Sequence, residues 1–215
     1  MLKIEKTVLP SPEQWEAVIE GMRNPMNSWD KIDSYDNGGH FFLGDNDRTL
    51  MRNLANAGTE HSKYRRMIPV WVTINAPLYW WKEADTYTVG KVQNSCSTMH
   101  KIHAKEFTMQ DFSCEHLEDI FLHGLRDTIE LLNLARKMYL LAKEEKEPLV
   151  PAKDCWWQMI QLLPTSYNQK RTVFCNYEVL AKMYRERKNH KLDEWHTLCD
   201  WIMTLPYSEL ITMGE

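Results

Sequence analysis

The chain has 215 residues, of which 43% are hydrophobic and 26% are charged, values close to those of an average globular protein. This balance excludes wholesale disorder, and no apolar run approaches the roughly 20 residues that span a membrane. The 30 acidic and 26 basic side chains give a net charge of -4, which argues against an extended nucleic-acid surface. We therefore expect a cytoplasmic protein with no membrane segment and no nucleic-acid partner.

The N-terminal part of the sequence predicts two helices. Ser11 and Pro12 suit an N-cap followed by a proline at the first helical position. The apolar residues that follow at helical spacing are Trp15, Val18, Ile19 and Met22. Residues 34–46 are rich in Gly, Asn and Asp, which is typical of a loop. Asp45 or Asn46 then caps a second helix, which Gly58 ends. Its expected apolar face comprises Leu50, Leu54 and Ala57.

The rest of the chain predicts one strand pair, one further strand and four helices. Residues 68–74 are β-branched and aromatic, which indicates a buried strand that Pro77 closes, whereas residues 78–100 are ambiguous. The longest helix is expected over residues 114–145. Its apolar positions are Leu117, Ile120, Phe121, Leu125, Thr128, Leu132, Ala135, Met138 and Ala142. The remaining expected elements are a helix over 153–161, a strand pair around 162–174, and helices over 176–188 and 191–204.

Long helices with few strands predict an α+β fold, a small mostly antiparallel sheet covered by long helices. No linker-like segment interrupts the chain, so a single domain over residues 1–215 is expected. Histidines gather at His100 and His103, and again around His116 and His123, but without the HExxH or Cys/His spacing of a zinc site. No metal is therefore expected. The sequence also lacks a Walker loop, a GxGxxG motif and a GxSxG motif.

Two stretches, Leu50–Trp81 and Leu162–Trp195, resemble the flavin-dependent thymidylate synthase family when taken together and in this order. That family has a Gly-His-Glu-Ser-Pro-Phe-Glu-His turn, followed by a strand ending in Ile-x-Ala-Pro. The matching positions here are Gly58, Glu60, Ser62, Tyr64, Thr73, Ile74, Ala76 and Pro77. Near its C-terminus the family has a Leu-Pro, an Asn twelve residues later, an Arg eleven residues after that, and then a His and a Glu. The corresponding residues here are Pro164, Asn176, Arg187, His190 and Glu194, with one residue fewer between Arg and His.

The resemblance implies a set of site residues. Arg187 stands at the position where the family's Arg stabilises charge on the pyrimidine, and Ser97 stands in the stretch that lines the nucleotide site. These two residues are the catalytic and substrate-binding candidates. Asn94, Asn176 and His190 are the cofactor-binding candidates. Four of these residues have a structural alternative: Arg187 could pair with Glu194 or Asp193, whereas Ser97, Asn176 and His190 could cap or join helices.

Several positions depart from the family's pattern. The Arg-His-Arg signature, which holds the flavin and polarises the pyrimidine, is replaced by Tyr87, Thr88 and Val89. The Arg two residues after the conserved-type Asn becomes Glu178. Other replacements are Met99 and Ile160 for arginines, and Arg65-Arg66 for Glu-His. Losing charged hydrogen bonds to a phosphate, each worth ~1.5–3 kcal/mol, has a large effect on affinity.

The resemblance implies a flavin-dependent thymidylate synthase-like fold and the methylation of dUMP to dTMP, with FAD, NADPH and methylenetetrahydrofolate. It also implies a homotetramer with active sites between subunits, and a pyrimidine deoxynucleotide as ligand. The alternative is a non-catalytic nucleotide-binding or scaffold protein that keeps the fold and the oligomer. Basic turns at Lys63–Arg66 and Lys170–Arg171 could supply phosphate charge from new positions or could simply be solvated. Paired tryptophans could cover an interface or stack on a flat ring; they are Trp80, Trp81, Trp156 and Trp157.

Overall fold

A computed structural model describes residues 1–212 and confirms the α+β class. The helices of this part of the chain are α1 (Pro12–Arg23), α2 (Asp45–Asn56), α3 (Leu78–Ala84), α4 (Asp119–Glu144), α5 (Ala152–Leu162), α6 (Tyr177–Arg187), α7 (Asp193–Met203) and α8 (Glu209–Thr212). The strands are β1 (Lys3–Val8), β2 (Tyr35–Asp36), β3 (Phe41–Phe42), β4 (Pro69–Pro77), β5 (Val92–Ser95) and β6 (Asn168–Asn176). A short 3₁₀ helix, η3, covers Lys63–Met67. Among the described residues, no helix is long and apolar enough to cross a membrane.

The described chain divides into two compact units. The helical-pair unit consists of residues 1–3, 75–84 and 95–171, and the sheet unit consists of residues 4–74, 85–94 and 172–212. Each unit has its own buried residues and is described by itself. The expectation of one domain over residues 1–215 stays a prediction.

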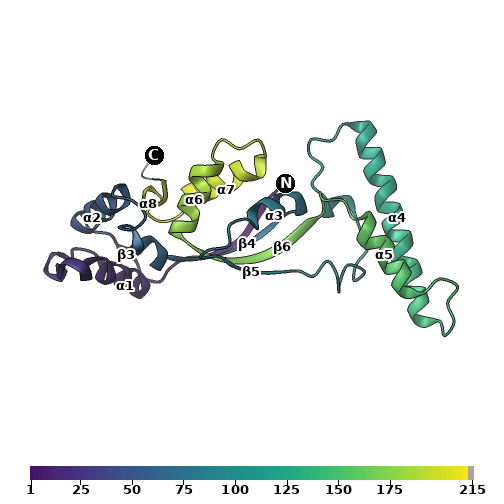
Figure 1. Ribbon diagram of the computed structural model, residues 1–215, viewed down its shortest axis with the longest axis horizontal. Helices are drawn as coiled ribbons and strands as arrows, with labels where there is room; N and C mark the ends of the chain where they lie inside the picture. Colours follow the sequence, from purple (N-terminus) through teal and green to yellow (C-terminus); the bar gives the residue numbers. More distant parts are fainter. Residues whose placement is uncertain (213–215) are drawn as a thin grey trace. The chain divides into compact units, whose positions relative to one another are not determined.

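The four longer strands form one sheet in the order β1-β4-β6-β5. The tilted rings of Trp71 and Phe174 pack with their centroids 5.0 Å apart, and the hydroxyls of Thr73 and Thr172 are 3.0 Å apart. Residue numbers thus rise along β4 as they fall along β6, so the two strands are antiparallel. Figure 1 shows β4 and β6 as the longest arrows of this sheet.

The strand pair predicted around residues 162–174 is wrong, because this stretch contains most of a single strand, β6, and no second strand. Pro164 has no N–H for a strand ladder, and its carbonyl instead accepts a bond from the Tyr167 N–H at 3.0 Å, which closes a turn. The ambiguous stretch 78–100 contains α3 and β5.

Helix α1 forms as the sequence predicts. The Ser11 side chain accepts from the Gln14 N–H, while the Gln14 side chain accepts from the Ser11 N–H at 2.9 Å, which is a complete capping box. The expected apolar face is buried, with Trp15 only 3% exposed. Helices α5, α6 and α7 likewise cover the expected ranges to within about two residues.

Helix α2 starts in a way that differs from the prediction of Asp45 or Asn46 as the cap. Gly44 is the N-cap residue, and the carboxylate of Asp33 accepts the N–H bonds of Asn46 and Asp47 at 2.8 and 3.0 Å. Burial raises the pKa of Asp33, but its hydrogen bonds, led by those from the Asn46 and Asp47 N–H groups, more than offset this effect and hold the pKa below its usual value. A residue outside the helix therefore caps it.

The buried face of α2 also differs from the prediction. Met51 and Ala55 are buried, whereas Leu50 and Leu54 are only half-buried and line a groove of about 1010 Å³. Gly58 has a φ of 109° just after the helix, as a helix-ending glycine does.

Residues 34–46 form a β-hairpin rather than a plain loop. Tyr35 pairs with Phe42 in the antiparallel ladder of β2 and β3. At the base of the hairpin, the fully buried Asp47 carboxylate accepts from Arg23 Nε at 2.6 Å and from the N–H groups of Asp33 and Ser34. This ion pair ties α1, the hairpin and α2 together.

In the helical-pair unit, α4 and α5 lie side by side (Figure 1). Their shared core contains Leu125, Ile129, Leu132 and Met159. Helix α4 begins at Asp119 rather than near Cys114, because the Leu117 N–H bonds to the Cys114 carbonyl in a separate turn. Ile120 and Phe121, expected on the apolar face, are 74% and 62% exposed.

Candidate functional site

Arg187 is the last residue of α6, the helix that follows β6. The Asn176 side chain accepts from the Val179 N–H at 3.0 Å and so caps the start of this helix. An eleven-residue helix places its two ends roughly 16 Å apart. Within one chain, Asn176 and Arg187 therefore lie at opposite ends of α6.

The Arg187 side chain is held by two aromatic residues of the sheet unit. Its Nε donates to the Tyr87 hydroxyl at 2.9 Å. Its guanidinium carbon lies 4.9 Å from the Trp195 ring centroid and 5.7 Å from that of Tyr87. Trp195 is completely buried and Tyr87 is 5% exposed, so both rings are fixed by packing. The half-buried Arg187 cation thus has a defined orientation.

Tyr87 connects two charged side chains. Its hydroxyl donates to Glu186 Oε2 at 2.7 Å while it accepts from Arg187. Burial raises the pKa of Tyr87 to about 12, and the hydrogen bond to Glu186 acts in the same direction. The phenol is consequently neutral at physiological pH and acts as a hydrogen-bonding support, not as a base.

His190 lies beside this cluster. Its Nδ1 accepts from the Leu192 N–H at 3.2 Å, and its ring centroid is 6.2 Å from that of Trp195. His190 also lines a depression of about 530 Å³ between the end of α6 and α7, together with Lys188, His196 and Asp200. No group of three or more metal-ligating side chains capable of holding an ion occurs in residues 1–212.

The other predicted site residues lie elsewhere in their units. Asn94 is exposed on β5 of the sheet unit. Ser97 belongs to the helical-pair unit, where its hydroxyl accepts from the His100 N–H at 2.8 Å, as a capping residue does. The structure therefore brings Arg187 and His190 together. Asn176 caps α6, which was the structural alternative for this residue. Their catalytic and binding roles stay predictions.

Sequence reasoning missed the role of Tyr87, which it interpreted only as a lost arginine. The loop that carries it also approaches α6 closely at Gly90, which has a φ of 77°. A Cβ at this position would lie 3.2 Å from the side-chain Nδ2 atom of Asn176. The loop over residues 85–91 thus contacts α6 near both ends. A tyrosine at a signature-arginine position is the only signal in the sequence that points to this contact.

The short helix η3, in which Arg65 and Arg66 depart from the family's pattern, lies beside α6. Burial raises the pKa of Tyr64 to about 12, with opposing electrostatic contributions from Arg65 and Glu178. In the resemblance described above, Arg65 stands where the family has a Glu and Glu178 where it has an Arg. The Oε2 atom of Glu178 is buried.

The tryptophan pair of α3 is a core feature of the helical-pair unit. Trp80 and Trp81 are 2% and 1% exposed. Trp81 Nε1 donates to the Gln169 carbonyl at 2.8 Å, and the Arg171 guanidinium lies 4.3 Å from the Trp81 ring centroid. These rings are covered within the chain. Trp157, at 40% exposure, is accessible.

This arrangement, a small antiparallel sheet with α6 directly after β6 and a long helical pair between β5 and β6 in the sequence, is the flavin-dependent thymidylate synthase-like fold. Two solved thymidylate synthases of this type from Helicobacter pylori, both with FAD and dUMP, are similar to the chain. One has a TM-score of 0.60 at 16% identity over 97% of this chain and 94% of that one. The other has a TM-score of 0.62 at 15% identity over 98% and 97%.

A third similar structure is the UMP/dUMP methylase PolB from Streptomyces cacaoi, bound with 5-Br dUMP. Its TM-score is 0.60 at 13% identity, covering 100% of this chain and 95% of that one. No protein-family model and no curated protein matches the chain. At such low identities the likeness establishes the fold, and function has to be argued from the chain's own residues.

Proposed function

We propose that this protein binds a pyrimidine deoxynucleotide, with Arg187 as the principal contact to negative charge on the ligand. The observation that carries the proposal is the fixed orientation of the Arg187 guanidinium on Tyr87 and Trp195. A cation already held by packing loses less side-chain freedom when an anion binds. A guanidinium also offers paired donors to a phosphate or to a pyrimidine carbonyl.

A flavin fits the chain less well than a nucleotide does. FAD carries a pyrophosphate with two negative charges, which cationic side chains usually neutralise. The signature positions hold a phenol, a hydroxyl and an isopropyl group at Tyr87, Thr88 and Val89. Glu178 adds a carboxylate where the family has an Arg. These residues do not fit the pyrophosphate at the family's positions, and we therefore derive no reaction step through a flavin.

The second candidate function is the full reaction, methylation of dUMP to dTMP with FAD, NADPH and methylenetetrahydrofolate. It is favoured by the FAD and dUMP bound in the similar Helicobacter pylori enzymes. Copurification of FAD, visible as a flavin absorbance spectrum of the purified protein, would support this candidate. A colourless protein that binds dUMP but not added FAD would support nucleotide binding and would exclude the full reaction.

A homotetramer belongs to the same proposal. Asn176 and Arg187 lie at opposite ends of α6, so a compact site that uses both residues would take them from two copies of the chain. The sites would then form between subunits, as the resemblance implies.

Isothermal titration of the full chain with dUMP tests the proposal. Arg187→Ala should weaken binding by roughly 10- to 100-fold, the equivalent of a lost charged hydrogen bond. The matched control is Arg185→Ala, an exposed residue of the same helix turn that should leave affinity unchanged. Equal affinities for wild type and Arg187→Ala, or no dUMP binding by the wild type, would refute the proposal.

A further inference from the structure

A short stretch of the helical-pair unit, residues 99–103, is fastened to both helices of the pair. On one side, Trp156 of α5 donates from its Nε1 to the Met99 carbonyl at 2.9 Å. On the other side, Arg136 of α4 donates from its Nε to the His103 carbonyl at 2.9 Å. The backbone of this stretch therefore has a fixed position relative to α4 and α5.

The imidazole ring of His103 packs on Tyr139 of α4, with the ring centroids 4.6 Å apart. Its Nδ1 atom is buried whereas Nε2 is not, and neither nitrogen has a hydrogen-bond partner within residues 1–212. Buried polar groups in folded proteins nearly always have a partner, and one that the chain does not supply comes from a ligand or from water. This imidazole can therefore donate a hydrogen bond to a ligand from Nε2.

Positive charge from two segments gathers around this ring. Arg136, Tyr139 and Lys143 are three and four residues apart, so they lie on one face of α4. The Nζ atom of Lys143 lies 5.6 Å from the Tyr139 ring centroid. Burial lowers the pKa of His103, and the charges of Lys143, Lys101 and Arg136 act in the same direction.

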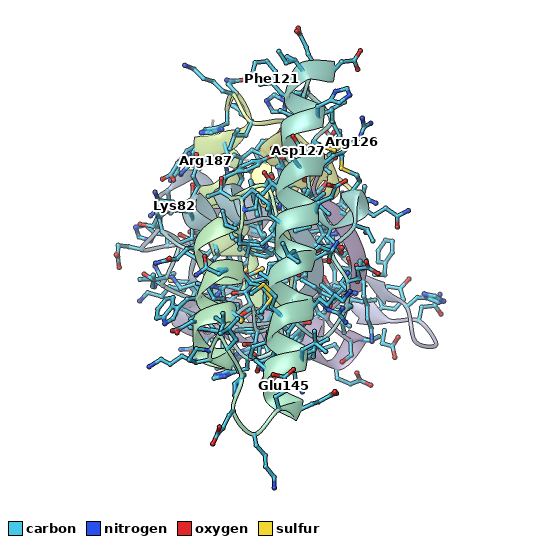
Figure 2. All side chains as sticks on the ribbon, turned by 90° about the vertical axis from the view of Figure 1, so that its right-hand side faces the viewer. Lys82, Phe121, Arg126, Asp127, Glu145 and Arg187 are labelled. Carbon is cyan, nitrogen blue, oxygen red and sulfur yellow. The ribbon has the colours of Figure 1, made fainter. Side chains whose placement is uncertain are left out.

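Figure 2 shows α4 facing the viewer, with Phe121 near one end and Glu145 at the other. Lys143 is two residues before Glu145, so the cations gather toward that end of the helix. A lysine in the last turn of a helix is expected from the helix dipole. The dipole explains neither Arg136 nor Lys101.

These three cations are not neutralised within the chain. In the part of the chain that the structure describes, neither Lys101, Arg136 nor Lys143 forms an ion pair with a carboxylate. Lys105, by contrast, pairs with Asp111 only two residues after His103. Like charges that gather without a counter-charge repel one another, and an anion removes that repulsion.

We propose that Lys101, Arg136 and Lys143 bind a phosphate group, to which His103 donates a hydrogen bond from Nε2. A phosphate carries up to two negative charges and accepts several hydrogen bonds, and Arg and Lys are its usual partners. Arg136 uses its Nε on the His103 carbonyl, which leaves its terminal nitrogens for phosphate oxygens. The ligand is inorganic phosphate or the phosphate of a larger compound. The site uses no residue of the Arg187 cluster and does not rest on the proposed function.

The first test is a titration of the full chain with sodium phosphate at constant ionic strength, followed through the NMR signals of the His103 ring. The His103→Gln variant identifies these signals by their loss. Lys101→Gln/Lys143→Gln should weaken phosphate binding at least about tenfold. The matched control is Arg126→Gln/Lys137→Gln, which removes two charges from exposed residues of α4 and should leave the affinity unchanged. Far-UV circular dichroism verifies that each variant is folded.

The second test uses sulfate, which stays doubly charged between about pH 5 and 8, where an imidazole titrates. The groups that face His103 keep their charge state in this range; they are Lys101, Arg136, Tyr139 and Lys143. A bound dianion stabilises the imidazolium, so saturating sulfate should raise the pKa of His103. By linkage, sulfate should bind about tenfold more tightly at pH 5 than at pH 8. This pH dependence should disappear in His103→Gln.

Binding of dUMP to the same variants identifies the source of the phosphate. If Lys101→Gln/Lys143→Gln binds dUMP more weakly than its control does, the phosphate is that of the nucleotide. If dUMP binding is unchanged while phosphate binding is lost, the site takes a separate phosphate compound. Arg187→Ala should leave the phosphate response of His103 unchanged, so failure of the proposed function and failure of this site give different results.

Three results would overturn the inference. They are His103 signals that do not move with phosphate up to roughly 10 mM, equal weakening in the two double variants, and a pKa of His103 that sulfate leaves unchanged. Binding of an oligonucleotide without binding of phosphate would also overturn it, because the cations would then form a nucleic-acid surface.

Discussion

Removing the Tyr87 hydroxyl tests how Arg187 is held. Tyr87→Phe keeps the ring under the guanidinium but removes the acceptor of the 2.9 Å bond from Arg187 and the donor of the 2.7 Å bond to Glu186. Glu186 is exposed and can bind water instead, so its share of the loss is small. The Arg187 bond lies in a half-buried place, and its loss costs about 1 kcal/mol.

We expect a small decrease in the melting temperature and a larger decrease in the affinity for dUMP. For a chain of this size, about 1 kcal/mol lowers the melting temperature by roughly 2–4 °C. With its orientation loosened, Arg187 should also bind dUMP more weakly, though less so than when the side chain is removed. Calorimetry and titration on the same sample measure both effects.

Tyr184→Phe is the matched control, since Tyr184 is a half-buried tyrosine of α6 whose ring already lies near Lys188. It should change neither the melting temperature nor the affinity. If Tyr87→Phe behaves as Tyr184→Phe does in both measurements, the reasoning that Tyr87 positions Arg187 is refuted.

Three further predictions concern stability. Asp47→Ala leaves the buried Arg23 cation without its partner, which should cost about 3–5 kcal/mol in chemical denaturation. Gly44→Ala should destabilise the fold comparably, because a Cβ there would lie 2.2 Å from the Asp33 side chain and 2.4 Å from its carbonyl oxygen. Burial and a carboxylate hydrogen bond raise the pKa of Tyr87 to about 12, above the ordinary 10.0. The free energy of unfolding should therefore fall between pH 10 and 12, where only the unfolded chain loses this proton, and less steeply in Tyr87→Phe.

Local signals were sufficient for much of the fold. The capping box at Ser11 and Gln14 lies within four residues, and α1 begins where that motif predicts. The same holds for Pro77, which ends β4, and for Asn176, which caps α6. In each case, the interaction that fixes the boundary is made by neighbours in the sequence.

Boundaries fixed by distant residues could not be predicted. The cap of α2 is Asp33, more than ten residues before the helix, so no local pattern reveals it. The apolar spacing of α4 correctly predicted that Leu125, Leu132 and Ala135 are buried, whereas Ile120 and Phe121 near its start are exposed. The extent of the buried face depends on α5, which packs on Leu125 and Ile129.

The candidate site also combines residues that the sequence could identify with contacts that it could not. Arg187 and His190 could be proposed from the resemblance of their spacing to that of the flavin-dependent thymidylate synthase family. Their support could not, since Tyr87 lies 100 residues before Arg187 in the sequence. Comparison with the family's pattern shows that an Arg is missing at position 87. The contact of Tyr87 with Arg187 is visible only in the structure.

The clamp at the base of the β2–β3 hairpin determines where this chain tolerates added sequence. Asp33 and Asp47 fix the two ends of the hairpin to each other, so a change of length near Gly44 would break the α2 cap. At the tip, Gly38 and Gly39 are exposed and have open space where a side chain would be. A peptide tag or a fluorescent label inserted between these two glycines leaves the clamp intact, and it gives a handle on the sheet unit that alters no residue of α4 or of the Arg187 cluster.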